Sequence, residues 1–199
     1  MGTTGAPIGP LFDIPDFTIS GVLPPFLGPT PTESALMSPY RTSLTRIAGK
    51  LCGSDQRKAI FRGLLAYRQA LGGIGLQSGV QWLSGSFAED IEGLETRHPN
   101  DVDVVTFCHR PPAMKNDDAA WQAFVMTNIA LINPVAVKAA YKCDAYFVDL
   151  DIAPVTVVNS TRYWFGLFSH RRGGLWKGML EVELPVTVDD ADASLVVGP

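Results

Sequence analysis

The spacing of the apolar residues changes at Gly72-Gly73, and this change limits the possible folds more than any other feature of the sequence. Before these glycines, apolar residues recur every three or four positions, which is the period of a helix with one buried face. We expect a first helix with Ser38 as its N-cap, Pro39 at its first position and its end at Gly53. A second helix is expected to start at Ser54 and to end at Gly72-Gly73.

Basic residues occupy other positions of the second predicted helix: Arg57, Lys58, Arg62 and Arg68. Charged side chains opposite an apolar stripe are typical of a face in contact with solvent. We therefore expect a solvated face, with phosphate binding by some of these residues as the alternative.

After Gly73, runs of β-branched and aromatic residues alternate with stretches of helical spacing. The expected strands cover residues 80–84, 102–108, 144–150 and 179–184. The expected helices cover 117–131, 134–141 and an aromatic stretch that follows Pro154 and ends at Phe168. This mixture predicts the α/β (or α+β) class, with a small mixed sheet flanked by helices.

The first 39 residues hold 8 of the 15 prolines, which excludes a helix over much of this segment because proline lacks the N–H donor. Residues 1–37 also carry many apolar side chains, so we expect an arm packed on the domain rather than a disordered leader. These side chains are Leu11, Phe12, Ile14, Phe17, Ile19, Val22, Leu23 and Phe26. The domain itself is expected to span 38–187, and an acidic tail, 188–199, is expected to fray.

The 199 residues include 16 Lys or Arg and 20 Asp or Glu, a formal net charge of −4. This charge disfavours a long nucleic-acid track but not a small phosphate ligand. Cys52, Cys108 and Cys143 lack metal-ligand spacing and lie in apolar sequence, which indicates buried thiols in a reducing compartment. Because we find neither a signal peptide nor an apolar run of about 18 residues, we expect a cytoplasmic protein without a membrane span.

Asp101 and Asp103 are two residues apart at the start of a predicted strand, so their carboxylates should point to the same face of the sheet. Val102 and Val104 alternate with them and should anchor the opposite face in the core. Adjacent carboxylates repel each other, and their oxygens are the hard ligands that Mg²⁺ prefers. The pair therefore predicts a metal site.

Gly85-Ser86 follows another predicted strand, and 14 residues separate this pair from Asp101. A glycine-serine turn places backbone N–H groups and a hydroxyl where a phosphate can bind, and glycine allows close approach of a ligand. A site with two metal ions needs a third carboxylate from a neighbouring strand. Asp144, which opens its strand as Asp101 opens its own, is the first candidate, and Asp149 is the reserve.

This order of motifs resembles the nucleotidyltransferase superfamily of DNA polymerase β. More closely, the chain is similar to small bacterial and phage nucleotidyltransferase-like proteins, over most of residues 18–184. The shared segments are a Leu-Pro-Pro arm (21–25), a Ser-Gly-Ser-Phe turn (84–87), Pro-Asn-Asp-x-Asp (99–103) and a late Arg172 with Lys177-Gly178.

The resemblance implies a minimal nucleotidyltransferase core that transfers NMP from a nucleoside triphosphate to a hydroxyl of a protein, an RNA end or a nucleotide. Asp101, Asp103 and Asp144 would hold two Mg²⁺ ions, or Mn²⁺, and Asp144 would accept the proton of the attacking hydroxyl. Gly85 and Ser86 would position the phosphates. By resemblance, the setting would be a toxin–antitoxin or phage-defence system.

The basic turn 170–177 stands out in an acidic chain, and from it Lys177 and Arg172 are candidates for phosphate contacts. A plain surface hairpin is the alternative. Tyr163, Trp164 and Phe165 could stack on a base, although their helical spacing favours a place in the core.

Two further hypotheses compete with catalysis. Four acids between the turn and Asp101 form a flap that is solvated or repels anionic acceptors: Glu89, Asp90, Glu92 and Glu95. This flap and the open choice of third acid leave room for a catalytically inactive binding or regulatory partner. The proline-rich arm also suggests exchange between copies of the chain in a homo-oligomer.

Overall fold

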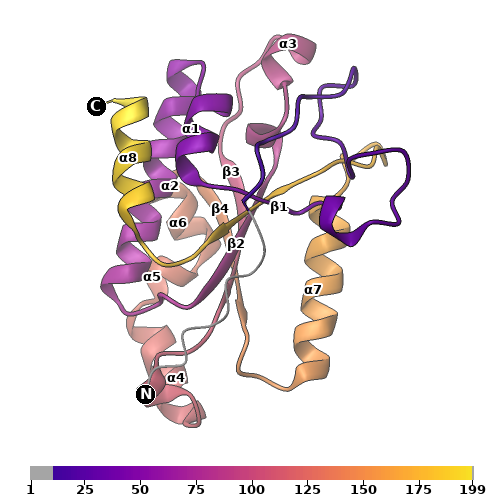
Figure 1. Ribbon diagram of the computed structural model, residues 1–199. Coiled ribbons are helices and arrows are strands. Elements are labelled where there is room, and N and C mark those ends of the chain that lie inside the picture. The colour runs from indigo at the N-terminus through magenta and orange to yellow at the C-terminus, as the bar shows by residue number, and fades with distance from the viewer. Residues whose placement is uncertain (1–10, 199) are drawn as a thin grey trace.

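A computed structural model describes residues 11–198 and has a five-stranded mixed sheet of order β1-β5-β2-β3-β4 (Figure 1). The strands are β1 (Tyr40–Arg41), β2 (Gly79–Ser84), β3 (Val102–Cys108), β4 (Cys143–Asp149) and β5 (Leu180–Glu183). Strand β2 runs antiparallel to both β3 and β5, whereas β3 pairs in parallel with β4 and β1 with β5. The predicted class, a small mixed sheet flanked by helices, is confirmed.

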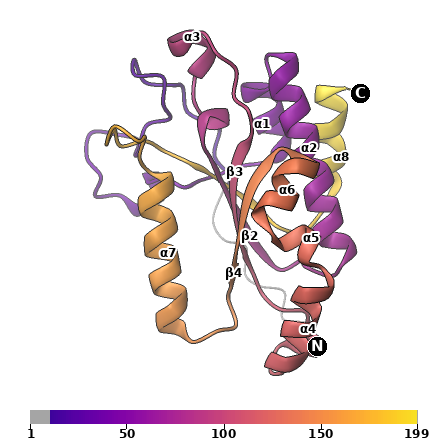
Figure 2. The same ribbon diagram turned by 180° about the vertical axis from the view of Figure 1, so that it is seen from behind.

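The helices lie on both faces of this sheet (Figures 1 and 2). They are α1 (Leu44–Leu51), α2 (Asp55–Gly73), α3 (Ile91–Glu95), α4 (Asp118–Thr127), α5 (Ile129–Ile132), α6 (Pro134–Tyr141), α7 (Pro154–Phe168) and α8 (Val188–Val197). Helices α1, α2, α5, α6 and α8 gather on one face, and α7 stands against the other. The core follows this division, because alternate strand residues enter separate apolar clusters: Val102 and Val104 join the helix-rich side, and Val105 and Phe107 join the α7 side.

The second predicted helix is confirmed, because α2 has Ser54 as its N-cap and ends at Gly73. The first begins later than predicted, at Leu44, with Ser43 as its cap. The Ser38–Pro39 peptide is cis and leads into strand β1. Pairing with β5 satisfies the backbone there, since the N–H of Tyr40 donates to the carbonyl of Met179. The predicted helix 117–131 is also divided, with a break at residue 128.

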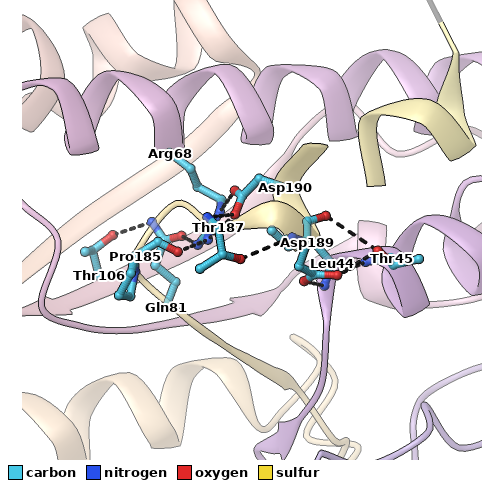
Figure 3. Close-up of polar contacts among 9 residues, drawn as sticks. All are labelled: Leu44, Thr45, Arg68, Gln81, Thr106, Pro185, Thr187, Asp189 and Asp190. Carbon is cyan, nitrogen blue, oxygen red and sulfur yellow. Dashed lines mark hydrogen bonds and ion pairs between the residues drawn. The ribbon is translucent and has the colours of Figure 1, made fainter. Parts of the chain in front are cut away.

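The expectation of a solvated basic face on α2 is wrong for Arg57 and Arg68, which are 4% and 1% exposed. Arg68 Nε donates to Asp190 Oδ1 over 2.7 Å, and its Nη1 donates to Gln81 Oε1 over 2.8 Å (Figure 3). Gln81 in turn donates to the hydroxyl of Thr106. The long guanidinium side chain thus reaches acceptors on β2 and α8 that helical spacing in the sequence does not reveal.

The tail from 188 does not fray over its described part but forms α8, packed beside α1 and α2 (Figure 1). Ala193 and Val197 enter the core. The acids dock the helix: Asp190 pairs with Arg68, and Asp189 accepts hydrogen bonds from the backbone N–H groups of Leu44 and Thr45 at the start of α1 (Figure 3). Residue 199 lies outside the described residues.

The proline-rich arm lies on the domain from residue 11 onward, and residues 1–10 of the predicted arm lie outside the described residues. Ile14 and Leu23 belong to the core. The carbonyl of Leu23 accepts a hydrogen bond from the N–H of Gly178, where a Cβ would lie 2.4 Å from the carbonyl oxygen of Pro24. The Lys-Gly pair of the sequence therefore includes a glycine because the arm passes directly against it.

We expect Arg68→Met to lower the free energy of unfolding by about 3–5 kcal/mol, because Asp190 and Gln81 would keep buried polar atoms without their partner. Urea denaturation followed by circular dichroism measures the change. Lys58→Met on the same helix is the control, since its ion pair with Asp55 is exposed and should contribute less than about 1 kcal/mol. Equal midpoints for the two variants would contradict the role given to Arg68.

Candidate active site

The sheet register brings the predicted acids to one end of the sheet. Ser84, the last residue of β2, lies opposite Asp103 of β3, and Asp103 lies opposite Asp144 of β4. Strand β2 ends where β3 and β4 begin, because it runs antiparallel to β3. Asp103 and Asp144 alternate with residues of the helix-rich core, so they project on the face that α7 covers. Asp101 precedes Asp103 by two residues, so strand alternation gives it the same face.

Gly85 packs directly against Asp103, which leaves no room for a side chain at this position. Its φ of 78° favours glycine, and a Cβ at this position would lie 2.7 Å from Asp103 Oδ2. The turn continues through a short 3-10 helix, Ser86–Ala88, in which Ser86 is half-buried. The Ser84 hydroxyl donates to the carbonyl of Phe168 at the end of α7 and ties the turn to that helix. The predicted glycine-serine turn and the Asp-x-Asp strand are thus in direct contact.

Lys138 of α6 completes the group, and the sequence did not predict it. Its ammonium lies 2.5 Å from Asp101 Oδ2 and 3.3 Å from Asp144 Oδ2. Hydrogen bonds with Asp101, then the charges of both acids, raise the pKa of Lys138. The one signal for this residue is its place in the last turn of a helix that leads directly into the strand of Asp144.

Ionisation of Asp103 is opposed by its surroundings. Burial, followed by the negative charges of Asp101 and Asp144, raises the pKa of its carboxyl from 3.8 to about 6. Lys177 and Lys138 offset part of this effect. The three acids therefore create a local excess of negative charge that favours a cation.

The donor set suits Mg²⁺ in its chemistry, since carboxylate oxygens are the ligands that this ion prefers. Within residues 11–198, however, no three His, Cys, Asp or Glu side chains are grouped so that they could hold a metal ion. The ammonium of Lys138 bridges Asp101 and Asp144 instead. Lys138 is half exposed on a flexible stem, so a divalent cation can take its place only if this side chain moves away.

Lys177 lies beside the turn, but its ammonium is committed to other partners. It is 4% exposed, contacts Glu89 Oε1 at 2.6 Å and lies 3.4 Å from the carbonyl oxygen of Gly85. Arg171 pairs with Glu89 as well, which fastens the basic loop to the segment after the turn. Lys177 is thus placed to position the turn, whereas Arg172 is exposed on the loop.

The acid-rich flap is not solvated throughout. Glu89 is buried between Lys177 and Arg171. Burial alone would raise the pKa of Glu92. Hydrogen bonds from Ser54, His98 and Arg57 outweigh this effect and lower the pKa to about 2. These two acids hold the flap against α2 and the basic loop.

The structure separates the reserve acid, Asp149, from the other three. It ends β4 at the far end of the strand and pairs with Arg110 at 2.8 Å, which also binds Asp118. Strand alternation also gives it the opposite face from Asp144. Asp144 is therefore the acid that joins Asp101 and Asp103.

The sequence profile of a family of unknown function, DUF6932, matches residues 15–183, from the arm to the end of β5. The chain belongs to the DUF6932 family. No curated protein and no solved structure is significantly similar to this DUF6932 chain. The helices in its described part are all too short or too polar to cross a membrane.

We expect Asp103→Asn to stabilise the DUF6932 chain at pH 7 by about 1–3 kcal/mol, because it removes a carboxylate whose ionised form is disfavoured in the fold. The raised pKa makes the folded state bind this proton more tightly than the unfolded state. The free energy of unfolding of the wild type should therefore decrease as the pH rises from about 4 to about 6. The difference in this free energy between variant and wild type should shrink as the pH falls toward 4. Thermal unfolding across this range measures both effects.

Asp192→Asn is the control for the change of charge, since Asp192 is an exposed residue of α8 outside the site. It should leave the pH profile unchanged. A profile for Asp103→Asn that parallels wild type would contradict the electrostatic account of the site.

Proposed function

We propose that the chain is a Mg²⁺-dependent nucleotidyltransferase that moves NMP from a nucleoside triphosphate to a hydroxyl acceptor. The observation that carries this proposal is the packing of Gly85 against Asp103, with Asp144 in register on the next strand. A phosphate-binding type of turn and three carboxylates thereby share one end of the sheet. A cytoplasmic location agrees with the three buried free cysteines, Cys52, Cys108 and Cys143.

In this proposal Mg²⁺ supplies, when bound, the positive charge that offsets the triphosphate and the acids. Asp101 and Asp103 would hold it on one side, and Asp144 would complete the site after Lys138 leaves. The turn at Gly85-Ser86 would orient the β- and γ-phosphates by backbone N–H groups. Lys177 would keep this turn in place through Glu89, and Arg172 is free to approach the phosphates from the loop.

The reaction needs one bond formed and one broken at the α-phosphorus. The acceptor oxygen would form the new P–O bond, and the bond to the pyrophosphate oxygen would break. The carboxylate of Asp144 would take the proton of the attacking hydroxyl. The acceptor is a protein side chain, an RNA end or another nucleotide, and toxin–antitoxin or phage-defence systems are settings in which such a transfer would act.

A second candidate is a catalytically inactive domain that binds or regulates a partner protein. The contact of Lys138 with both Asp101 and Asp144 favours it, because an ammonium already balances the acids. In such a domain the lysine would replace the metal permanently.

Transfer is tested by incubating the protein with each α-labelled nucleoside triphosphate and Mg²⁺ or Mn²⁺, with and without cell extract. We expect label on one acceptor class, and a loss of at least about 100-fold for Asp101→Asn and Asp103→Asn. Asp192→Asn should keep full transfer. Absence of label in every condition, or full transfer by both site variants, would contradict the proposal.

A further inference from the structure

An aromatic surface begins beside Asp144. Tyr146 follows Asp144 by two residues on the same face of β4, so the two side chains are neighbours along this strand. The ring of Trp164 on α7 lies over Tyr146, with centroids 4.6 Å apart. Tyr163 contacts Trp164 edge-on at 5.0 Å. The three rings thus form a continuous surface that leads from the acids to the outside of α7.

Core packing accounts for only part of this surface. Phe168 is buried, and Phe165 packs against Trp82 within the cluster between α7 and the sheet. Trp164 is half-buried there, but Tyr163 is 60% exposed. The core interpretation of the aromatic run therefore holds for Phe165 and in part for Trp164, and it does not hold for Tyr163. An exposed ring in contact with a tilted aromatic pair offers a planar apolar contact to a ligand.

The strand order gives a bound nucleotide a direction. The turn at Gly85, Asp103 and Asp144 lie on the neighbouring strands β2, β3 and β4. Strands are spaced by about 4.8 Å, so the step from the turn to Asp144 is about 10 Å. If the turn holds the outer phosphates and the acids hold the α-phosphate, the nucleoside must continue past β4. Tyr146 lies on β4 itself, and Trp164 of α7 connects it to Tyr163.

The opposite direction is unsuited to a nucleotide. Beyond β2 on the same face, β5 presents Glu181, which accepts a hydrogen bond from the indole of Trp82, and then Glu183, paired with Arg41 of β1. These carboxylates give a base no ring to stack on, and the aromatic residue of β1, Tyr40, is buried. Aromatic surface and strand order therefore agree on one orientation.

We propose that Tyr163, together with Tyr146 and Trp164, forms the surface on which the base of the nucleoside triphosphate stacks. This inference rests on the proposed function and assigns the donor base to α7. Stacking on aromatic rings tolerates different bases, so the surface contributes affinity more than base selectivity. Tyr146 links the two parts, because it follows Asp144 by two residues on the same face of β4 and its ring contacts Trp164.

The test is calorimetric binding of ATP, GTP, CTP and UTP in Mg²⁺, with inorganic tripolyphosphate as the ligand that lacks a base. Tyr163→Ala should weaken nucleotide binding by about 5- to 100-fold and leave tripolyphosphate binding unchanged. Tyr163→Phe should keep wild-type affinity, because it retains the ring. Val155→Ala, an equally exposed position at the far end of α7, should change neither ligand.

Unchanged nucleotide affinity in Tyr163→Ala, with tripolyphosphate still bound by wild type, would overturn the stacking surface and leave the proposed function intact. Equal weakening of nucleotide and tripolyphosphate would also overturn it, since the effect would not concern the base. Failure of wild type to bind either ligand would overturn the proposed function and, with it, this inference.

Discussion

The parallel pairing of β3 with β4 is the constraint on which the candidate site depends. Its register sets Asp103 opposite Asp144, and it is held by side chains on both faces of β3. Val102 and Val104 enter the core under the helices, while Val105 and Phe107 enter the core under α7. A shift of one residue would move every one of these side chains to the wrong face. The acids are therefore held together by apolar packing that has no chemical part in the site.

The three neighbouring carboxylates repel one another, and lysines from elements that are distant in the sequence offset this repulsion. Lys138 of α6 contacts Asp101 and Asp144, and Lys177 before β5 lowers the cost of ionising Asp103. The fold uses the same solution elsewhere, where Arg68 balances Asp190 between α2 and α8. Each cation lies in, or just before, a helix or strand that contributes to the apolar core, so charge balance and core formation are coupled.

Local signals in the sequence were sufficient for most elements. The start of α2 at its Ser54 cap, the strand 102–108 and the helix 134–141 follow from caps, β-branched runs and an Asn-Pro start. The failures have one physical cause. The predictions of a solvated Arg57 and Arg68 and of a frayed tail from 188 are wrong because the partners that bury these residues lie far away in sequence. Periodicity describes one element at a time and contains no information on such partners.

The sequence by itself determined which residues could share a face: Asp101 with Asp103 by strand alternation, and Gly85 as the residue that permits a tight turn. Only the tertiary structure decided which strand lies beside which. In the folded chain Asp144, and not Asp149, lies beside Asp103, and Lys138 contacts two of the acids. Lys177 pairs with Glu89, and Tyr163 is exposed on α7. The reason is that alternation and capping act within a few residues, whereas register and ion pairing join groups brought together by burial of the whole core.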